Sequence, residues 1–372
     1  MSKFKDSGII CRLKEIRNKK KITQTKLAKL VGVKRQAIYD LEAGRYLPNT
    51  SIALKLAKIL NCSVEDIFVE ESMDSQPVVL VDDHDTMDPR VRLAKIRNIV
   101  YAYPLLRDFS MGDEMKAADG LLSPCNTMAT MLNSNDYLKN TAVLLGCDPA
   151  FSILGHHVQK TGIDADVYCR FASSKKSLTQ LAKGQAHLAG IHMHDKGGID
   201  GNQELTEKLL KNFKGVLVAF SFFEEGLLVA KGNPFDIRKP EDLAQKQIRF
   251  VNREKGAALR HLLDDLVCES DIPFSEINGY DNIVLNHSQG AQKILHGVCD
   301  AALGLKAVAT AFNLGFVPLS RVRCDLVIPW DLLDHTGVKT ALDTLQKQSF
   351  KNELSSIPGY DSSCTGKIIK EF

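Results

Sequence analysis

The chain of 372 residues is 44% hydrophobic and 25% charged, with a formal net charge of +3, which excludes a fibrous or disordered chain and indicates two or three globular domains. No apolar run is long enough to span a membrane, and the first 21 residues lack the apolar core of a signal peptide. The nine cysteines form no Cys-x-x-Cys pair, so we expect reduced thiols and a cytoplasmic location.

Charge is distributed unevenly along the chain. Residues 1–70 carry 15 Lys and Arg against 7 Asp and Glu, whereas the remaining residues carry 33 against 38. A compact basic segment on a mildly acidic body is typical of nucleic-acid binding, although a basic face can also be simply solvated.

The basic segment, residues 1–70, has the pattern of five short helices. Apolar spacing and capping residues predict a helix near Leu13–Arg17 and further helices at 24–31, 34–43, 50–60 and 63–68. A short turn at Gly32 joins the second and third helices, which is the arrangement of a helix-turn-helix. Its small core would be formed by Leu27, Ala28, Val33, Ile38 and Leu41.

Residues 12–68 resemble the Xre or phage-repressor helix-turn-helix family. The matching positions are Gln24, Ala28, Gly32-Val33, Ile38, Leu41-Glu42, Gly44 and Pro48. The resemblance implies that the third helix enters the major groove, with Lys34, Arg35, Gln36 and Tyr39 at the base edges. It also implies that Gln24 and Arg45 hold phosphates and that Arg17 and Glu42 form a framework ion pair. The alternative is a helical bundle that binds a protein.

Two segments follow before the pattern of the chain changes. Residues 71–88 contain six acidic residues and no Lys or Arg, so we expect a solvated linker. Residues 89–140 show short β-like runs and a helix-like stretch at 126–138, which predicts a small α+β connecting layer without assigned chemistry.

From Thr141 to the C-terminus, strand-like and helix-like runs alternate, which predicts an α/β fold with parallel sheets. The stretches LAKGQAHLAGI (181–191) and ILHGVCDAALG (294–304) repeat one pattern, with Gly184 aligned to Gly297 and His187 to Asp300. We therefore expect two similar lobes, lobe I at 141–228 and 326–372 and lobe II at 229–325. Hinges are expected near Gly226–Lys231 and Arg323–Pro329.

Residues 141–372 resemble the type II periplasmic-binding-protein fold, in the intracellular form fused to Xre-type domains. The resemblance rests on the blocks GCDPAFSIL, GQAHLAGIHM, LLVAKGNP, RFVNREKG, GVCDAALGL, DLVIPWDLL and GYDSSCTG. These domains are related to molybdate- and tungstate-binding proteins. The resemblance thus implies a small anionic ligand between the lobes, either an oxyanion or a metabolite linked to the molybdenum cofactor.

The turn at Cys147 and Asp148 is the first candidate for the ligand site. Asp148 would cap a helix whose free N–H groups bind an anion. Cys147 could be a nucleophile, but His156 and His157 lie too far along the same helix to act as its base, so we favour an inert buried thiol.

Further turns supply the other candidate residues. Ser173 and Ser174 follow a strand and could either cap the next helix or bind an oxyanion. The stretch NREKGAALR lacks the hydroxyls of the family's Arg-Gly-Ser-Gly-Thr-Arg pattern but keeps cations for an anion. From this stretch we take Arg253, Lys255, Gly256 and Arg260 as candidate ligand-binding residues, and from the later stretch VLNHSQGA we take His287. His192 would hydrogen-bond the ligand, and a metal held by His192, His194 and Asp195 is the disfavoured alternative.

These features together predict a ligand-responsive transcription regulator that binds operator DNA as a homodimer. We expect no catalytic residue, no metal and no cofactor, because no nucleotide, hydrolase or zinc motif is present. One alternative is an enzyme that acts on a small ligand in the cleft, and another is a DNA-binding protein whose lobed domain serves only for dimerisation.

Overall fold

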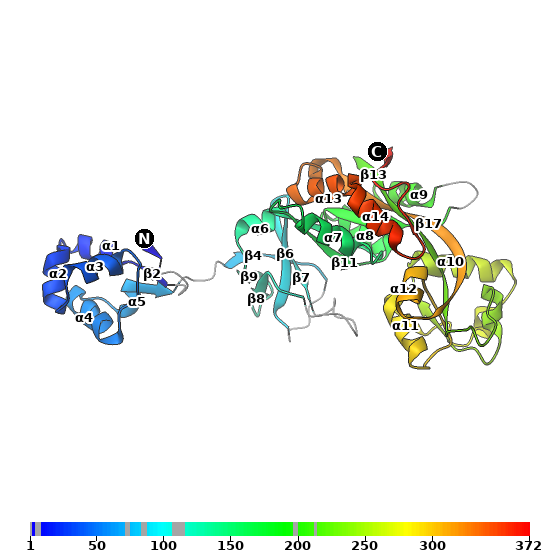
Figure 1. Ribbon diagram of the computed structural model, residues 1–372, viewed down its shortest axis with the longest axis horizontal. Coiled ribbons are helices and arrows are strands. Elements are labelled where there is room, and N and C mark those ends of the chain that lie inside the picture. Colours follow the sequence, from blue (N-terminus) through cyan, green and yellow to red (C-terminus); the bar gives the residue numbers. More distant parts are fainter. Residues whose placement is uncertain are drawn as a thin grey trace. The chain divides into compact units, whose positions relative to one another are not determined.

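The computed structural model describes residues 2–3, 9–70, 75–82, 88–105, 116–195, 200–211 and 214–372. It divides into two compact units, Met1–Ser75 and Gln76–Phe372, and Figure 1 labels their elements. None of the helices formed by the described residues combines the length and the apolar character that crossing a bilayer requires.

The first unit consists of five short helices and a small sheet. The helices are α1 (Leu13–Lys19), α2 (Gln24–Val31), α3 (Arg35–Glu42), α4 (Thr50–Leu60) and α5 (Val64–Ile67). The sheet joins β1 (Ser2–Lys3), β2 (Ile9–Cys11) and β3 (Phe68–Glu70). The five predicted helices are confirmed, whereas the sheet was not predicted because its strands have only two or three residues each.

Local signals explain why these helices begin and end where they do. The side chains of Thr23, Asn49 and Ser63 each accept a backbone N–H in the first turn of α2, α4 and α5. Gly32 ends α2 with a φ of +83°, a conformation that glycine adopts without strain. The buried core then comes from the apolar faces, with Leu27, Ile38 and Leu41 fully covered.

The second unit begins with a six-stranded sheet of order β4-β9-β8-β6-β7-β5. Its elements are β4 (Ser75–Pro77), β5 (Val79–Leu80), β6 (Arg90–Ile96), β7 (Ile99–Pro104), β8 (Gly120–Leu122), β9 (Met128–Met131) and helix α6 (Asn135–Asn140). Two strands, β4 and β5, thus come from the segment predicted to be a linker, of which 71–74 and 83–87 lie outside the described residues. The predicted helix at 126–138 is wrong in its first half, because 128–131 form the strand β9, which pairs with β8.

This small sheet packs against the larger body through buried ion pairs. Arg92 on β6 lies 2.7 Å from both Asp119 and Asp166, and the hydroxyl of Tyr137 donates to Asp166 at 2.8 Å. Val81, Tyr101 and other side chains of the small sheet share one buried cluster with Leu145 and Tyr168 of the larger body. The connecting layer is therefore fixed to the body.

The larger body is built on one mixed sheet of order β11-β10-β12-β17-β13-β16-β14-β15, with β18 and β19 also paired to β13. Its strands are β10 (Thr141–Gly146), β11 (Asp166–Phe171), β12 (Leu188–His192), β13 (Gly215–Val229), β14 (Phe250–Arg253), β15 (Ile283–Val284), β16 (Ala301–Leu305), β17 (Gly315–Pro329), β18 (Tyr360–Asp361) and β19 (Ile368–Glu371). Its helices are α7 (Phe151–Gln159), α8 (Ser174–Ala182), α9 (Gly201–Leu209), α10 (Ala258–Glu269), α11 (His287–Leu295), α12 (Lys306–Ala311), α13 (Thr336–Gln346) and α14 (Gln348–Ser356).

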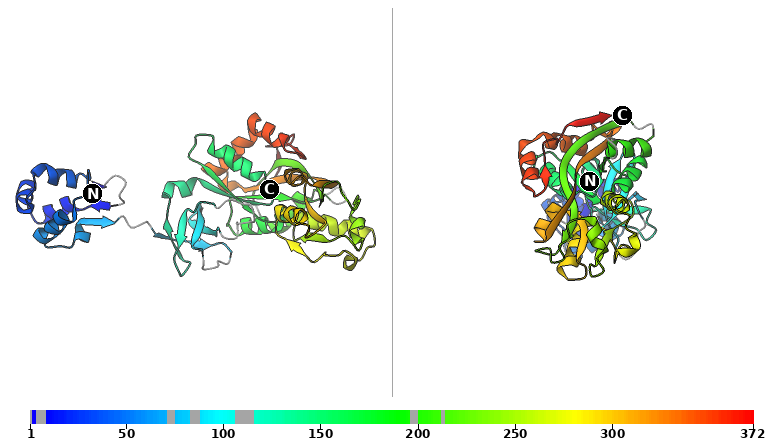
Figure 2. Two further views of the ribbon diagram at one scale, coloured as in Figure 1. Left: turned by 60° about the horizontal axis from the view of Figure 1, so that its bottom comes forward. Right: turned by 90° about the vertical axis from the view of Figure 1, so that its right-hand side faces the viewer.

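Two long antiparallel strands, β13 and β17, link the lobes (Figures 1 and 2). Strand β10 runs parallel to β11 and β12, and β14 runs parallel to β15 and β16, as predicted. Strands β13 and β17 run antiparallel to each other and to the other strands that pair with them, so the sheet as a whole is mixed. Residues 226–229 pair with 315–318, and 323–329 pair with 215–222. The two segments predicted to be hinges therefore do not face each other. The register irregularity at Ala219–Ser221 lies opposite Asp325 and Cys324 of the second segment, and the one at Glu225–Gly226 lies at the start of the first.

The internal repeat predicted from the sequence has a structural counterpart in the two lobes. Gly184 and Gly297 both have positive φ, at +70° and +66°, and each ends a helix before a buried strand. His187 accepts the backbone N–H of Val143 at 3.0 Å, and Asp300 accepts that of Arg249 at 2.9 Å. In both lobes, a side chain at this position thus accepts a backbone N–H from the neighbouring strand segment.

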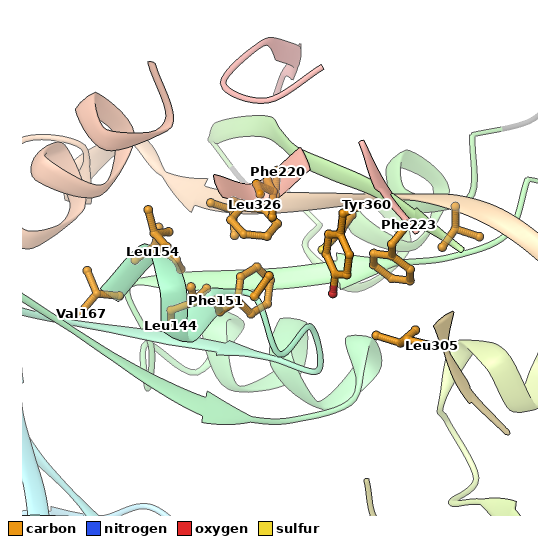
Figure 3. Close-up of a cluster of buried hydrophobic side chains, with 14 of the residues drawn as sticks. Leu144, Phe151, Leu154, Val167, Phe220, Phe223, Leu305, Leu326 and Tyr360 are labelled. Carbon is orange, nitrogen blue, oxygen red and sulfur yellow. The ribbon is translucent and has the colours of Figure 1, made fainter. Parts of the chain in front are cut away.

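Packing in the core fixes the turn at Cys147 and Asp148, which is the first candidate for the ligand site. The Phe151 ring lies over the strands β10 and β12, where a Cβ on Gly146 or Gly190 would approach it to 2.3 or 2.2 Å. Phe151 also packs on Phe220, with 4.8 Å between ring centroids (Figure 3). Because the start of α7 is held in this way, the turn between β10 and α7 has a fixed position.

Candidate functional site

The exposed face of α3 is the candidate DNA interface. Lys34, Arg35 and Gln36 are exposed at its N-terminal end, and Tyr39 is 46% exposed one turn later. The structure thus presents all four predicted base-reading side chains to solvent.

The two predicted phosphate-binding residues have partners within the unit. Arg45 is exposed, lies 2.7 Å from Asp40 and stacks over Tyr39 at 5.3 Å. The amide of Gln24 donates to Glu42 at 2.8 Å, and Glu42 also lies 2.5 Å from Arg17. A phosphate contact by Gln24 would therefore compete with its bond to Glu42.

A cavity of about 1060 Å³ is the candidate ligand site. It lies where the turn after β10, the end of β11 and the start of α8 face the turn after β14 and the start of α11. Cys147, Asp148, Ser173, Lys255, Gly256 and His287 line it, and each was predicted from the sequence. Segments of both lobes therefore meet around one space.

Asp148 shapes the lobe I wall, but it does not cap α7. The helix begins at Phe151 with Ala150 as its N-cap, so the predicted capping role is wrong. Instead, the buried Asp148 carboxylate accepts the N–H of Ala150 at 2.9 Å and the hydroxyl of Tyr360 at 2.6 Å. Burial raises the pKa of Asp148, and these two donors limit the rise. The sequence prediction failed because Pro149 and Ala150 form a tight turn before the helix.

The opposite wall is formed by the turn after β14. Gly256 has a φ of +101°, and a Cβ at this position would lie 4.0 Å from the Ser173 hydroxyl oxygen. Lys255 beside it is exposed at the cavity. The two lobes therefore approach each other closely at Ser173 and Gly256.

Four predicted ligand residues lie behind the cavity walls, namely Ser174, His192, Arg253 and Arg260. The Ser174 hydroxyl bonds both the N–H and the carbonyl of His192, at 3.1 and 3.0 Å. The guanidinium of Arg253 donates to Glu254 at 3.0 and 3.1 Å and to the Leu285 carbonyl at 3.2 Å. Arg260 donates to the Arg253 carbonyl at 2.8 Å. Because these polar groups already have protein partners, the placement favours a supporting role over direct ligand contact.

His287 and Arg253 connect the inner ends of the two lobes. Arg253 lies 3.2 Å from the His287 ring nitrogens and 5.5 Å from the ring centroid of Phe171 in lobe I. Burial, followed by the charges of Arg253 and His192, holds the pKa of His287 well below its usual value. His287 is therefore a neutral imidazole at the cavity wall.

The charges around the cavity favour an anion. Its lining contains six Lys and Arg against three Asp and Glu. The cations are Lys116, Arg170, Lys175, Lys176, Lys183 and Lys255. Asp82, which the sequence did not single out, lies 2.8 Å from Arg170 and 3.3 Å from Lys176. The remaining excess of positive charge gives the cavity an attractive potential for anions.

One contact chain at the site was not predicted. The Cys147 sulfur lies 3.4 Å from Nδ1 of His192, and Nε2 of His192 lies 3.5 Å from a carboxylate oxygen of Glu225. Glu225 lies on β13 and carried no sequence signal that linked it to Cys147. Among the described residues, no group of three or more His, Cys, Asp and Glu side chains is arranged to hold a metal ion.

Comparisons with known proteins agree with this architecture. Residues 155–346 match the family model of the PBP superfamily domain, and residues 13–67 match that of a helix-turn-helix. An uncharacterized HTH-type transcriptional regulator of Archaeoglobus fulgidus is 48% identical over 58 residues, which are 16% of this chain and 82% of that protein. YvgK, an uncharacterized protein of Bacillus subtilis, is 28% identical over 229 residues, which are 62% of this chain and 73% of YvgK.

One solved structure shows a low similarity to this chain. The sulfate-binding protein SubI from Mycobacterium tuberculosis is 14% identical, with a TM-score of 0.44, over 59% of this chain and 86% of SubI. None of these three proteins is named for molybdate or tungstate, so that part of the family resemblance stays a prediction.

Proposed function

The chain belongs to the PBP superfamily and carries a helix-turn-helix domain, and from this pairing we propose a transcription regulator whose DNA binding responds to a small anionic ligand in the cleft. The observation that carries the ligand class is the excess of cations around a cavity lined by both lobes. The match to HTH-type regulators favours a binding protein over an enzyme.

We propose that the ligand is held mainly by the residues that line the cavity. Lys255 supplies charge from lobe II, while Ser173 and the turn at Cys147 supply polar groups from lobe I. Arg253, Arg260, Ser174 and His192 support these walls from behind. An oxyanion such as molybdate or tungstate, or an anionic metabolite linked to the molybdenum cofactor, has the required charge.

For a regulatory switch, the ligand must bind one arrangement of the lobes better than another. The shift in DNA affinity cannot exceed that difference in binding free energy. We propose that lobe closure about the middle of β13 and β17 changes how two DNA-binding units of a cytoplasmic homodimer engage two half-sites. Sedimentation equilibrium of the full chain measures the oligomeric state, and a strict monomer would contradict this model.

The ligand class is tested with a panel of phosphate, sulfate, molybdate and tungstate, each with native mass spectrometry and thermal unfolding of the full chain. At least one anion should bind and raise the unfolding temperature. Lys255→Glu should weaken this binding about tenfold or more, because it places a like charge at the anion. Lys246→Glu is the matched control, since Lys246 is exposed in lobe II and does not line the cavity.

The regulatory part is tested on DNA selected from a random library by the protein itself. The anion that binds should change the affinity for this DNA, measured by fluorescence anisotropy at fixed ionic strength. If every anion leaves both the unfolding temperature and the DNA affinity unchanged, the anion-sensing proposal is wrong.

A further inference from the structure

A thiol, an imidazole and a carboxylate from three separate strands meet beside the cavity. Cys147 follows β10, His192 ends β12 and Glu225 lies near the middle of β13. The two contacts between them measure 3.4 and 3.5 Å. The residues are 8%, 3% and 0% exposed, in that order. Their order in space, sulfur to imidazole to carboxylate, is that of an activated nucleophile with an oriented base.

The imidazole is held firmly in this position. The Ser174 hydroxyl binds the backbone of His192 on both sides, and the Phe223 ring packs edge-on against the imidazole at 5.1 Å. The second Glu225 oxygen lies 2.6 Å from Nε2 of His194. Despite its burial, contacts with His192 and His194 lower the pKa of Glu225 to about 2. A permanent negative charge thus faces the far side of the His192 ring.

The charge state of His192 follows from these neighbours. Burial alone would lower its pKa, but Cys147 and then Glu225 hold that pKa well above the usual value. Other ionisable groups surround these three side chains. They are Asp148, Tyr360 and Cys324 on the lobe I side, and Arg253 and His287 on the lobe II side. The His192 ring thus places a positive charge 3.4 Å from the Cys147 sulfur.

Of these three residues, only Cys147 is among those that line the cavity, whereas His192 and Glu225 lie behind the wall. A small solute in the cleft therefore meets Cys147 before either of the other two residues. Because Cys147 is only 8% exposed, a small reagent is favoured over a bulky one.

We propose that Cys147 is a modification site at which a hydroperoxide oxidises the thiol to a sulfenic acid, with the His192 imidazolium as the charged partner of the sulfur and Glu225 as a positioning residue. With hydrogen peroxide, the thiolate sulfur attacks one oxygen, an S–O bond forms and the O–O bond breaks. The leaving hydroxide takes a proton from the solvent in the cleft and departs as water. Sulfur loses two electrons and the peroxide gains them, so the reaction is a single stoichiometric event that does not depend on which anion the cleft binds.

The first experiment needs no variant. The full chain is treated at pH 6 with hydrogen peroxide and a 1,3-diketone that traps sulfenic acids, and all nine cysteines are mapped by peptide mass spectrometry. Cys147 should be labelled well ahead of Cys364, which is equally buried at 7% and is the matched control. Labelling of Cys147 no faster than that of Cys364 would overturn the proposal.

The second experiment separates activation from folding by a pH profile of iodoacetamide alkylation. An ordinary thiol of pKa about 8.5 loses roughly a hundredfold in rate between pH 8 and pH 6, because its thiolate fraction falls by that factor. The Cys147 rate should fall clearly less than this over the same range, because the His192 ring lies 3.4 Å from the sulfur. A full hundredfold fall would show that the thiol is not activated.

Variants then test the two partners of the thiol. Glu225→Gln and His192→Gln should slow alkylation of Cys147 at pH 6 about tenfold or more and restore it at pH 9, where the thiol ionises without help. A merely structural defect would not be rescued by pH, and Trp330 fluorescence checks that each variant is folded. An unchanged pH 6 rate in a folded His192→Gln protein would exclude His192 from the proposed role.

Discussion

The buried ion pair of the DNA-binding unit gives the sharpest stability prediction. Arg17 and Glu42 are 8% and 7% exposed, and two contacts of 2.5 and 3.1 Å join them. Arg17 also donates to the Ile22 carbonyl at 2.8 Å. In Glu42→Ala, the Arg17 guanidinium still donates to the Ile22 carbonyl, but it remains buried without a negative charge beside it.

The expected cost is large for a small unit. Removal of one partner from a buried pair typically costs about 3–5 kcal/mol, because an uncompensated charge remains in the interior. A unit of this size has a total stability on the order of 5 kcal/mol. Glu42→Ala should therefore bring the DNA-binding unit close to unfolding. Asp40 lies on the same helix, and Asp40→Ala breaks its surface ion pair with Arg45, which should cost under about 1 kcal/mol.

Hydrogen exchange with peptide-level mass spectrometry measures both variants in the full chain. Amides of α3 should exchange about a hundredfold or more faster in Glu42→Ala, since each factor of ten corresponds to about 1.4 kcal/mol. Amides of β13 should not change, and neither should the fluorescence of Trp330, the single tryptophan, which lies in the second unit. An increase below tenfold in α3, or an equal increase in Asp40→Ala, would refute this reasoning.

Four further predictions follow from the contacts described above. Arg35→Ala should cost about 1–3 kcal/mol on DNA selected by the protein and relax its specificity, whereas Arg45→Ala should weaken selected and random DNA equally, as measured by anisotropy. A fragment of residues 1–75 should bind the selected DNA more weakly than the full chain, and no anion should change its DNA affinity. The fragment ends after β3 because a cut after Phe68 would remove two residues that pair with β2. Tyr360→Phe should cost about 1.5–3 kcal/mol in urea unfolding followed by Trp330 fluorescence, since Asp148 loses a donor while buried; an unchanged midpoint would count against this bond. The Glu225 carboxylate, with a pKa of about 2 against the usual 4.5, should stabilise the second unit above pH 4.5, and this contribution should be lost as the pH falls towards 2. When unfolding is measured at several pH values, the free energy of unfolding should fall less between pH 4.5 and pH 2 in Glu225→Gln than in the unchanged protein.

Local signals in the sequence were sufficient for the five helices of the DNA-binding unit, but not for its small sheet. Capping residues such as Thr23, Asn49 and Ser63 act within three residues of themselves, so they mark helix ends without knowledge of the rest of the fold. The repeat that aligns Gly184 with Gly297 also predicted two similar lobes, because each copy packs its own helix on its own strand. The matching blocks of residues indicated the PBP-like fold for the same reason.

Only the tertiary structure decided how the side chains of the cleft are used. Cys147, His192 and Glu225 are 45 and 33 residues apart in sequence, and they meet only because β10, β12 and β13 bring them to one place. Arg253 was predicted to face the ligand, but its neighbour Glu254 and the carbonyl of Leu285 bind the guanidinium behind the wall. A charged residue in a turn can point to solvent, to a ligand or to a buried partner, and residue type and spacing are the same in all three cases. The choice depends on which partners the fold places within about 3 Å, which is a property of the packed chain.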